Sequence, residues 1–299
     1  MAVVDSDPVL DGMPRRLFRA TPTRLTTWLD CPRKYRFSYL DSRPKGPPWA
    51  HNSVGVAAHN ALRDWWSDRV ADRTATAAAD LVRRHWIQDG FRDREQSVRW
   101  REATARVTAD YAGGLDPTAE PRGVERTVAA TTAVLTLSGR VDRIDERDSE
   151  DGGRELVVVD YKTGRRECTV DEARSSLALA VYLAGARRTF RLRSRRVELH
   201  HLPSGTIAAH EHTEQSLARH LARADEIGTE AAAAGRAWRD GLAARAADAA
   251  DGDVAANDAI DAVFPPRPGP MCSWCDFRAH CPQGSDSSER LQTWAALAD

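Results

Sequence analysis

The sequence is most informative at Gly139-Arg140-Val141-Asp142-Arg143-Ile144-Asp145 and at Val157-Val158-Val159-Asp160-Tyr161-Lys162-Thr163-Gly164. Both segments contain the β-branched residues that favour strands. The polar, glycine-containing stretch from Asp145 to Arg154 is expected to be the turn that joins two strands into a hairpin. We therefore expect Asp142 to end the first strand and to lie close to the second.

The charged residues of this hairpin indicate a metal site. Asp160 and Lys162 are two positions apart, so in a strand they share one face. Paired strands hold facing side chains about 5 Å apart, and two carboxylates at that separation repel unless a cation lies between them. Mg²⁺ takes such oxygen ligands, and a nearby lysine can polarise a water or neutralise phosphate charge. Phosphodiester hydrolysis needs these parts. The alternative is a surface hairpin with Asp160 and Lys162 as a solvated ion pair.

Asp142 followed by Asp160-Tyr161-Lys162 resembles the core of the PD-(D/E)XK nuclease superfamily. The whole pattern is most similar to its RecB-like exonuclease and Cas4-like branch. The resemblance implies an α/β, restriction-endonuclease-like fold with a core sheet flanked by helices. It also implies that residues 1–299 form a single nuclease domain, with an N-terminal helical region and a C-terminal cysteine-rich segment.

The resemblance assigns roles to individual residues. Asp142 and Asp160 would bind Mg²⁺ or Mn²⁺, with the carbonyl of Tyr161 as a third ligand. Lys162 would activate or orient the attacking water. The family also places a metal-binding histidine in a Gly-x-x-x-His setting on an early helix, and here that histidine is His59.

Two further positions follow from the same resemblance. A glutamate is frequent on the strand before the first aspartate, and Glu125 could fill that place. The branch often carries Gln-x-x-x-Tyr on the following helix. Tyr182 is present and is assigned to the catalytic group, but Ala178 stands where the glutamine would be. The departure affects one DNA-facing contact and leaves the metal chemistry unchanged.

The cysteines suggest a second metal centre. Cys272, Cys275 and Cys281 form a C-x-x-C-x5-C run, and Cys31 lies far upstream. Four thiolates at one centre bind either Zn²⁺ or an iron–sulfur cluster, and spacing alone leaves both open. Cys168 has no partner at ligand spacing and is expected to be a small residue that is buried or half-buried.

The one-plus-three arrangement is similar to the iron–sulfur members of the same branch, in which a [4Fe–4S] cluster joins the two ends of the domain. The resemblance implies a structural cluster bound by Cys31, Cys272, Cys275 and Cys281. Pro32 disfavours helical geometry at Cys31, so we expect that cysteine between two short helices. A disulfide framework is disfavoured by the length, the odd cysteine count and the lack of a secretory signal.

The composition limits how nucleic acid could bind. The net charge is −1, so any attraction for DNA must be local. The densest basic run spans residues 187–196. It is a candidate track for the phosphate backbone, and a solvated helix end is an equal alternative. Its arginines are Arg187, Arg188, Arg191, Arg193, Arg195 and Arg196.

The chain is expected to be cytoplasmic, because it has neither a signal peptide nor a stretch long enough to span a membrane. It has no Gly-x-x-x-x-Gly-Lys-Ser/Thr phosphate loop. Any helicase activity would therefore come from a separate partner.

The expected elements divide the chain into three parts: a mainly helical part at 21–120, a catalytic α/β core at 121–213, and C-terminal helices with the iron–sulfur segment at 214–285. Trp65 and Trp66 are expected to pack in the core or in a groove, with base stacking as the alternative. A helix is predicted over 171–188. The histidines of the second hairpin are expected to be exposed, namely His200, His201, His210 and His212.

Together these features predict a metal-dependent DNA nuclease. The favoured activity is that of an exonuclease on single-stranded or end-containing DNA in repair or recombination. One alternative is a Cas4-like nuclease of CRISPR adaptation. The other is a non-catalytic DNA-binding subunit of the same fold that works with a helicase partner.

Overall fold

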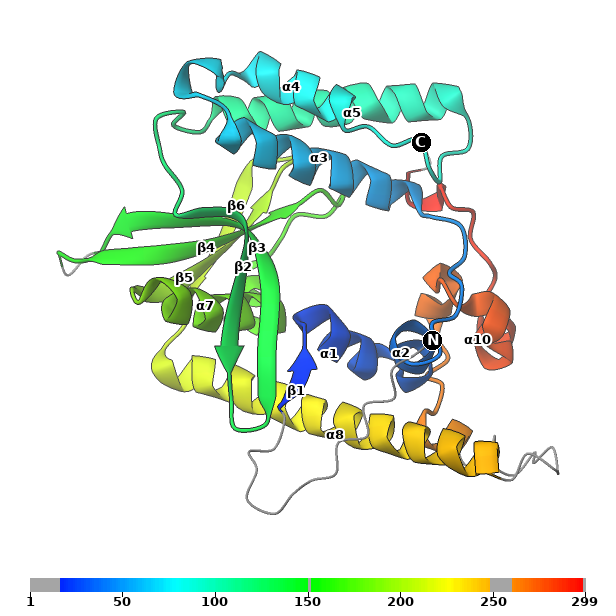
Figure 1. Cartoon of the computed structure of the whole chain (residues 1–299). Coiled ribbons are helices and arrows are strands. Elements are labelled where there is room, and N and C mark those ends of the chain that lie inside the picture. Colours follow the sequence, from blue (N-terminus) through cyan, green and yellow to red (C-terminus); the bar gives the residue numbers. More distant parts are fainter. Residues whose placement is uncertain (1–16, 150–151, 248–259, 298–299) are drawn as a thin grey trace.

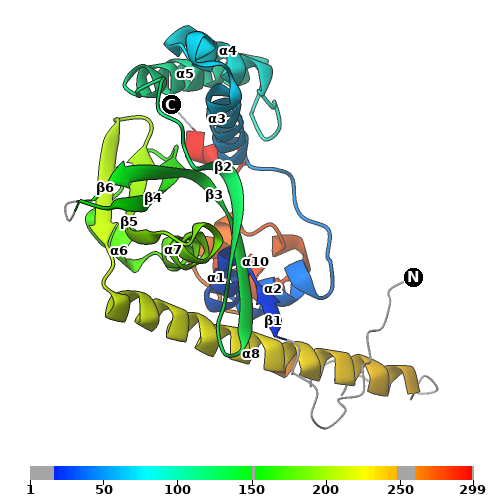
Figure 2. The same ribbon diagram turned by 60° about the vertical axis from the view of Figure 1, so that its left-hand side comes forward.

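The computed structural model describes residues 17–149, 152–247 and 260–297. A mixed β-sheet lies at its centre, with helices on both faces (Figure 1). The expected α/β architecture is confirmed. Figure 2 shows helices above the sheet and helices below it, of which the lowest is very long. The helices above are α3 (Ala50–Ser67), α4 (Ala75–Arg84) and α5 (Arg94–Gly113), and those below are α7 (Leu177–Phe190) and α8 (Glu214–Ala247).

The sheet is built around one long strand. Its order is β1-β3-β4-β5-β6, and β2 pairs with the other edge of β3. The β2–β3, β3–β4 and β5–β6 pairs are antiparallel, whereas β1–β3 and β4–β5 are parallel. The strands are β1 (Phe18–Ala20), β2 (Gly123–Thr131), β3 (Leu135–Asp148), β4 (Arg154–Lys162), β5 (Arg193–His201) and β6 (Thr206–Glu211).

The strand β3 is longer than expected. Asp142 lies inside it rather than at its end, and the ladder with β4 continues to the Asp148–Arg154 pair. Charged residues extend the strand because they pair across the hairpin. Arg154 on β4, for example, lies 3.1 Å from the Glu146 carboxylate on β3. The turn therefore begins after Asp148, and the prediction that it begins at Asp145 was wrong.

Alternation along β4 decides which layer each side chain meets. Leu156 and Val158 pack with residues of α7 such as Leu183, whereas Val157 and Val159 pack against α3. Because the period of a strand is two, Asp160 and Lys162 continue the row that begins with Leu156 and Val158. The end of β4 thus carries charged groups on the face where its preceding residues belong to the core.

The region expected as one helix over 171–188 is two helices, α6 (Val170–Ser175) and α7. The chain is extended at Ser176, whose hydroxyl accepts a hydrogen bond from the Leu179 amide at 3.2 Å. Thr169 and Glu172 form a capping box at the start of α6. Local side-chain capping therefore stops one helix and starts the next.

The first two helices meet the C-terminal segment. As predicted, α1 (Pro22–Asp30) and α2 (Pro32–Tyr39) are separated at Cys31, where the backbone is extended. Arg33 donates to the Phe264 carbonyl at 2.9 Å, and the Gly46 amide donates to the Asp276 carbonyl at 2.8 Å. Beyond these contacts come two short 3₁₀ turns, α10 and a final turn, at Pro270–Trp274, Arg278–His280, Pro282–Ser287 and Ala295–Leu297.

The prediction that the four histidines of the second hairpin are exposed was wrong. His200, His201 and His212 are buried, because α5, the 164 loop and α8 cover them. His200 contacts the Tyr111 hydroxyl at 2.7 Å, His201 the Gly164 carbonyl at 2.7 Å, and His212 the Ser216 hydroxyl at 2.9 Å. The remaining one, His210, is half-buried.

Trp65 and Trp66 are buried as expected. Among the described helices, none is both long and apolar enough to cross a membrane.

Candidate active site

Three adjacent strands bring three carboxylates together. The β3–β4 register pairs Arg143 with Val159, and one step further it sets Asp142 opposite Asp160. On the other edge of β3, the pairs on either side of Glu125 set it opposite Asp142. Asp142 is therefore the central acid of a row across the sheet.

The α3 helix adds an imidazole to this row. The His59 Nδ1 atom lies 3.4 Å from an Asp142 carboxylate oxygen. One ligand atom from each of His59, Glu125 and Asp142 lies within 4.8 Å of the others, and all three side chains are half-buried. In the described part of the chain, no other group of three such residues meets this condition. The structure thus joins two of the predicted metal ligands with Glu125.

Asp160 lies beside this group and contacts Lys162. The Lys162 Nζ atom is 2.6 Å from an Asp160 oxygen, and about half of the lysine side chain is exposed. Burial and the charge of Asp142 raise the pKa of Asp160, although Lys162 opposes the shift. Burial lowers the pKa of Lys162, but Asp160 raises it more, so the net change is upward. The amine therefore stays charged at neutral pH.

The backbone fixes the central acid. The amide of Tyr161 donates to an Asp142 carboxylate oxygen at 2.8 Å. On the other face of the sheet the Tyr161 ring is buried, and its hydroxyl lies 3.2 Å from the Trp66 indole nitrogen and 3.3 Å from the Arg143 guanidinium. The buried tyrosine thus holds the peptide group that orients Asp142.

Without a bound cation, the neighbouring carboxylates of this site repel one another. Burial and the neighbouring Asp142 raise the pKa of Glu125. Burial lowers the pKa of His59, but its hydrogen bond to Asp142 and the surrounding carboxylates give a net rise. The raised pKa values of the carboxyl groups and of the imidazole all show that this site favours positive charge. Oxygen and imidazole donors fit a divalent metal ion.

Glu125 has an unusual backbone. Its φ angle is +48°, which non-glycine residues seldom adopt within a strand. Such conformations are retained mainly where surrounding structure enforces them, commonly at functional sites. The sequence offered one signal for this residue, the family's frequent glutamate on the preceding strand. The conformation itself has no signature in the residue type.

Tyr182 reaches the site through a gap in β3. A Cβ atom at Gly139 would lie 2.3 Å from the Tyr182 Cε1 atom, so the ring occupies the space that a side chain would fill. Burial, followed by the charges of Asp160 and Asp142, raises the pKa of Tyr182 to about 12. The phenol is therefore neutral at neutral pH, and it lines the same cleft as Glu125 and Asp142.

One cleft of about 1580 Å³ is lined by His59, Glu125, Asp142, Lys162 and Tyr182, whereas Asp160 lies outside its lining. The α3 helix forms one wall, and the loop after β4 contributes Arg165 and Arg166. Trp49, which precedes α3, also lines the cleft, together with Met271 and Trp274 of the C-terminal segment. A groove of this size, with metal-binding groups and basic side chains, can hold several units of a polymer.

The basic run at 187–196 lies elsewhere. Arg193 pairs with Glu155 in the sheet, whereas Lys162 pairs with His201, so the run is at the opposite end of the strands. None of its residues lines the cleft. Arg187 and Arg196 form ion pairs with Glu214 and Glu198 at 2.8 and 2.6 Å.

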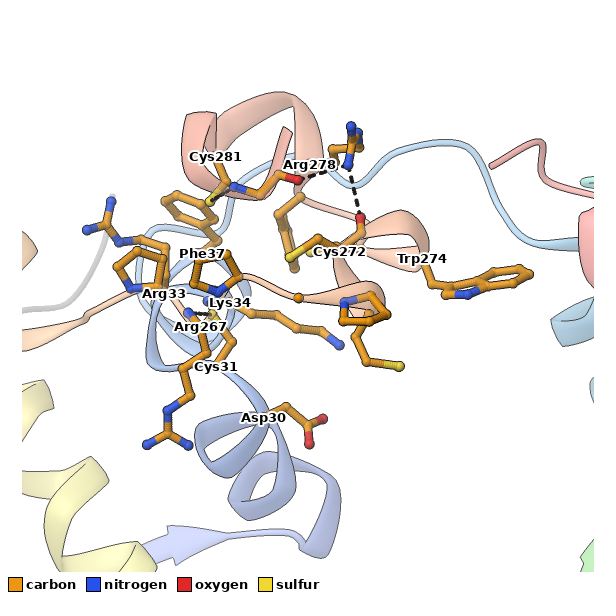
Figure 3. Close-up of a pocket in the computed structure, with 18 residues that line it drawn as sticks. Asp30, Cys31, Arg33, Lys34, Phe37, Arg267, Cys272, Trp274, Arg278 and Cys281 are labelled. Atoms are coloured by element: carbon orange, nitrogen blue, oxygen red, sulfur yellow. Dashed lines mark hydrogen bonds between the residues drawn. The ribbon is translucent and has the colours of Figure 1, made fainter. Parts of the chain in front are cut away.

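The four cysteines of the one-plus-three pattern line a single separate pocket of about 230 Å³, together with Arg33, Lys34 and Phe37. Figure 3 shows Cys31, Cys272 and Cys281 around this space. Cys31 also accepts a hydrogen bond from the Arg267 amide at 3.4 Å. Cys168 lies apart, half-buried against the α7 side of the sheet, as expected.

Residues 19–282 match the PD-(D/E)XK nuclease superfamily, and the chain belongs to this family. Members of the superfamily are in general nucleases that use divalent metals, which agrees with the donor set of the acidic row. No curated protein matches the chain.

Proposed function

We propose that this protein is a metal-dependent deoxyribonuclease of the RecB-like and Cas4-like branch that acts as an exonuclease on single-stranded or end-containing DNA. One observation carries the proposal. His59, Glu125 and Asp142 converge within 4.8 Å in a polymer-sized cleft, next to the Asp160–Lys162 pair. Repair or recombination is the setting that this activity fits, with helicase activity supplied by a partner.

The acidic row would hold Mg²⁺ or Mn²⁺. His59, Asp142 and Asp160 are the proposed ligands, joined by Glu125 and by the Tyr161 carbonyl. When bound, the metal supplies a polarised phosphate oxygen and a water of lowered pKa. Asp142 keeps its orientation through the Tyr161 amide, so the site is preorganised before substrate arrives.

Lys162 acts as a fixed positive charge. Its raised pKa keeps the amine protonated, so it orients the attacking water and offsets charge on the phosphate rather than accepting a proton. Tyr182, with a pKa of about 12, is a neutral hydrogen-bond donor on the same side. We propose that it contacts a phosphate oxygen or the leaving group.

We also propose that Cys31, Cys272, Cys275 and Cys281 hold a [4Fe–4S] cluster. All four cysteines line one pocket of about 230 Å³, so thiols from distant parts of the described chain share one space. Four thiolates at one centre bind either Zn²⁺ or an iron–sulfur cluster. The resemblance to the iron–sulfur members of the branch favours the cluster. Iron and acid-labile sulfide in anaerobically purified protein test this, and one zinc per chain without iron refutes it.

The nuclease proposal is tested with labelled single-stranded DNA and Mg²⁺ or Mn²⁺. The intact chain should degrade it, and Lys162→Ala should lose activity by about 100-fold or more. Lys45→Ala is the matched control, because Lys45 is an exposed lysine outside the cleft.

Equal cleavage by the intact chain and Lys162→Ala contradicts the catalytic role. Binding of DNA without cleavage by either protein supports the second candidate, a non-catalytic DNA-binding subunit. Products sampled over time from strands labelled at the 5′ or the 3′ end give the polarity and separate an exonuclease from an endonuclease.

A further inference from the structure

One wall of the cleft leads away from the acidic row along α3. His51 and His59 lie eight residues apart on this helix, and both line the cleft. At 1.5 Å per residue, their backbones are separated by about 12 Å along the helix axis. Successive nucleotides are at least about 3.4 Å apart, so this span covers a few nucleotides.

An aromatic cluster lies at the His51 end. The Trp274 ring centroid is 5.1 Å from that of Trp49, at an angle of 52°, and 5.8 Å from that of His51. Trp49 is buried, and its indole nitrogen donates to Asp276 at 2.9 Å. Trp274 itself is only half-buried, and its neighbour Met271 is 75% exposed. A firmly held ring therefore supports one that is open to the cleft.

The cluster also contains an unused polar atom. The Nδ1 atom of His51 is buried and has no hydrogen-bond partner among the residues that the structure describes. Burial lowers the pKa of His51, although Asp276 opposes this, so the ring is neutral at neutral pH. The neutral ring therefore contributes by packing edge-on against Trp274, at an interplanar angle of 79°.

We propose that Trp274, supported by Trp49 and His51, is a stacking platform for an unpaired base of single-stranded DNA a few nucleotides from the scissile phosphate. The proposal rests on the nuclease function above and specifies its substrate. Any base presents a flat face to an indole, and stacking tolerates sequence. Bases inside a duplex are already stacked, so the platform favours single strands.

The platform is also connected to the cysteine pocket. Trp274 lies between Cys272 and Cys275 in the sequence, and it lines both the cysteine pocket and the cleft. Figure 3 shows its ring pointing away from the labelled cysteines Cys31, Cys272 and Cys281. A metal or cluster that orders the cysteine segment would therefore also fix the position of the Trp274 ring in the cleft.

The test is equilibrium binding of a fluorescent single-stranded oligonucleotide in EDTA, where metal-dependent cleavage cannot interfere. Trp274→Ala should weaken binding roughly 5- to 150-fold, the range expected for one lost stacking contact. Trp274→Phe should retain most of the affinity, whereas Trp274→Leu, which keeps the apolar bulk, should not. Melting curves and iron content establish that each variant is folded.

A second measurement varies the oligonucleotide. The intact protein should bind an abasic oligonucleotide of equal length more weakly than the normal one, by a similar factor, and Trp274→Ala should show little difference between the two. Normal affinity in Trp274→Leu, or equal binding of both oligonucleotides by the intact protein, overturns the platform. Absence of any single-strand binding also overturns it.

The two proposals fail in different ways. Protein that binds single strands in a Trp274-dependent manner but does not cleave them with metal refutes the nuclease and retains the platform. If the intact chain cleaves DNA and its affinity for single strands does not depend on Trp274, only the platform is refuted.

Discussion

Gly139 shows how one missing side chain shapes the site. Because its Cβ position lies 2.3 Å from the Tyr182 ring, Gly139→Ala must displace that ring from the acidic row. We expect nuclease activity to fall by about 10-fold or more, as misplacement of a catalytic group by about 1 Å is costly. The measurement is the initial rate on single-stranded DNA at saturating metal.

A second glycine serves as the control for this prediction. Gly235 lies in α8, and a Cβ there would meet only the end of the Arg239 side chain, at 3.9 Å. Gly235→Ala should retain activity and gain up to about 1 kcal/mol in stability from helix propensity. If both variants cleave as fast as the intact chain, Tyr182 has no role that depends on its position.

Metal binding should be coupled to proton release. The raised pKa values of Asp160, Glu125 and His59 mean that these groups keep protons to higher pH than usual. Ligation requires their deprotonated forms. Affinity for Mn²⁺ should therefore rise with pH through these raised pKa values and level off above them.

Calorimetry at about pH 6, near the ordinary histidine pKa, should detect this release as a binding enthalpy that depends on the buffer. His59→Asn should reduce the number of protons released. A pH-independent affinity between about pH 6 and 8 would show that the three residues do not bind the ion.

At the scale of elements, the sequence predicted the hairpin, the helices around Cys31 and the second hairpin, because each has local signals. It missed the length of β3, since charged residues in a ladder resemble a turn when their partners are unknown. It also missed the burial of His200 and His201. Burial there depends on α5 and on the loop after β4, which are distant in the sequence.

Arg143 holds several of these elements together. It is 3% exposed, its guanidinium lies 5.2 Å from the Trp66 ring of α3, and it contacts Asp145 and the hydroxyls of Tyr111 and Tyr161. Arg143→Met leaves these polar groups short of a partner. We expect a loss of about 3 kcal/mol in unfolding free energy, measured with urea, since breaking a buried pair is costly.

Arg147 is the matched control on the same strand. It pairs with Asp145 at 2.8 Å and with Glu198 at 2.9 Å, but 41% of its side chain is exposed. When Arg147 is replaced, Asp145 still pairs with Arg143. Glu198 likewise still contacts Arg196 and His200. Arg147→Met should therefore lose about 1 kcal/mol or less. Equal losses in the two variants would argue against a special role for the buried arginine.

At the scale of the molecule, the site depends on contacts between distant segments. The Gly-x-x-x-His setting, the Val-Asp-Arg-Ile-Asp segment and the Asp-x-Lys motif predicted that His59, Asp142, Asp160 and Lys162 belong to one site. They did not indicate that the cleft continues to Trp274. That extension exists because α3 and the C-terminal segment meet, as in the contact between Trp49 and Asp276. No local pattern records such a contact.

The two ends of the described chain also meet at the cysteine pocket, which makes a prediction about the whole fold. A cluster bound by Cys31 and the three C-terminal cysteines closes a loop of most of the chain, and closing loops of that length is worth about 4 kcal/mol or more. Cys281→Ser should lower the melting temperature by roughly 10 °C in anaerobic scans and lower the iron content. Cys168→Ser removes a half-buried cysteine outside the pocket, so it should change the melting temperature and the iron content only slightly.

Because Trp274 lines both the cysteine pocket and the cleft, Cys281→Ser should also weaken binding of single-stranded DNA, whereas Cys168→Ser should not. An unchanged melting temperature in Cys281→Ser would mean that packing alone holds the two ends together.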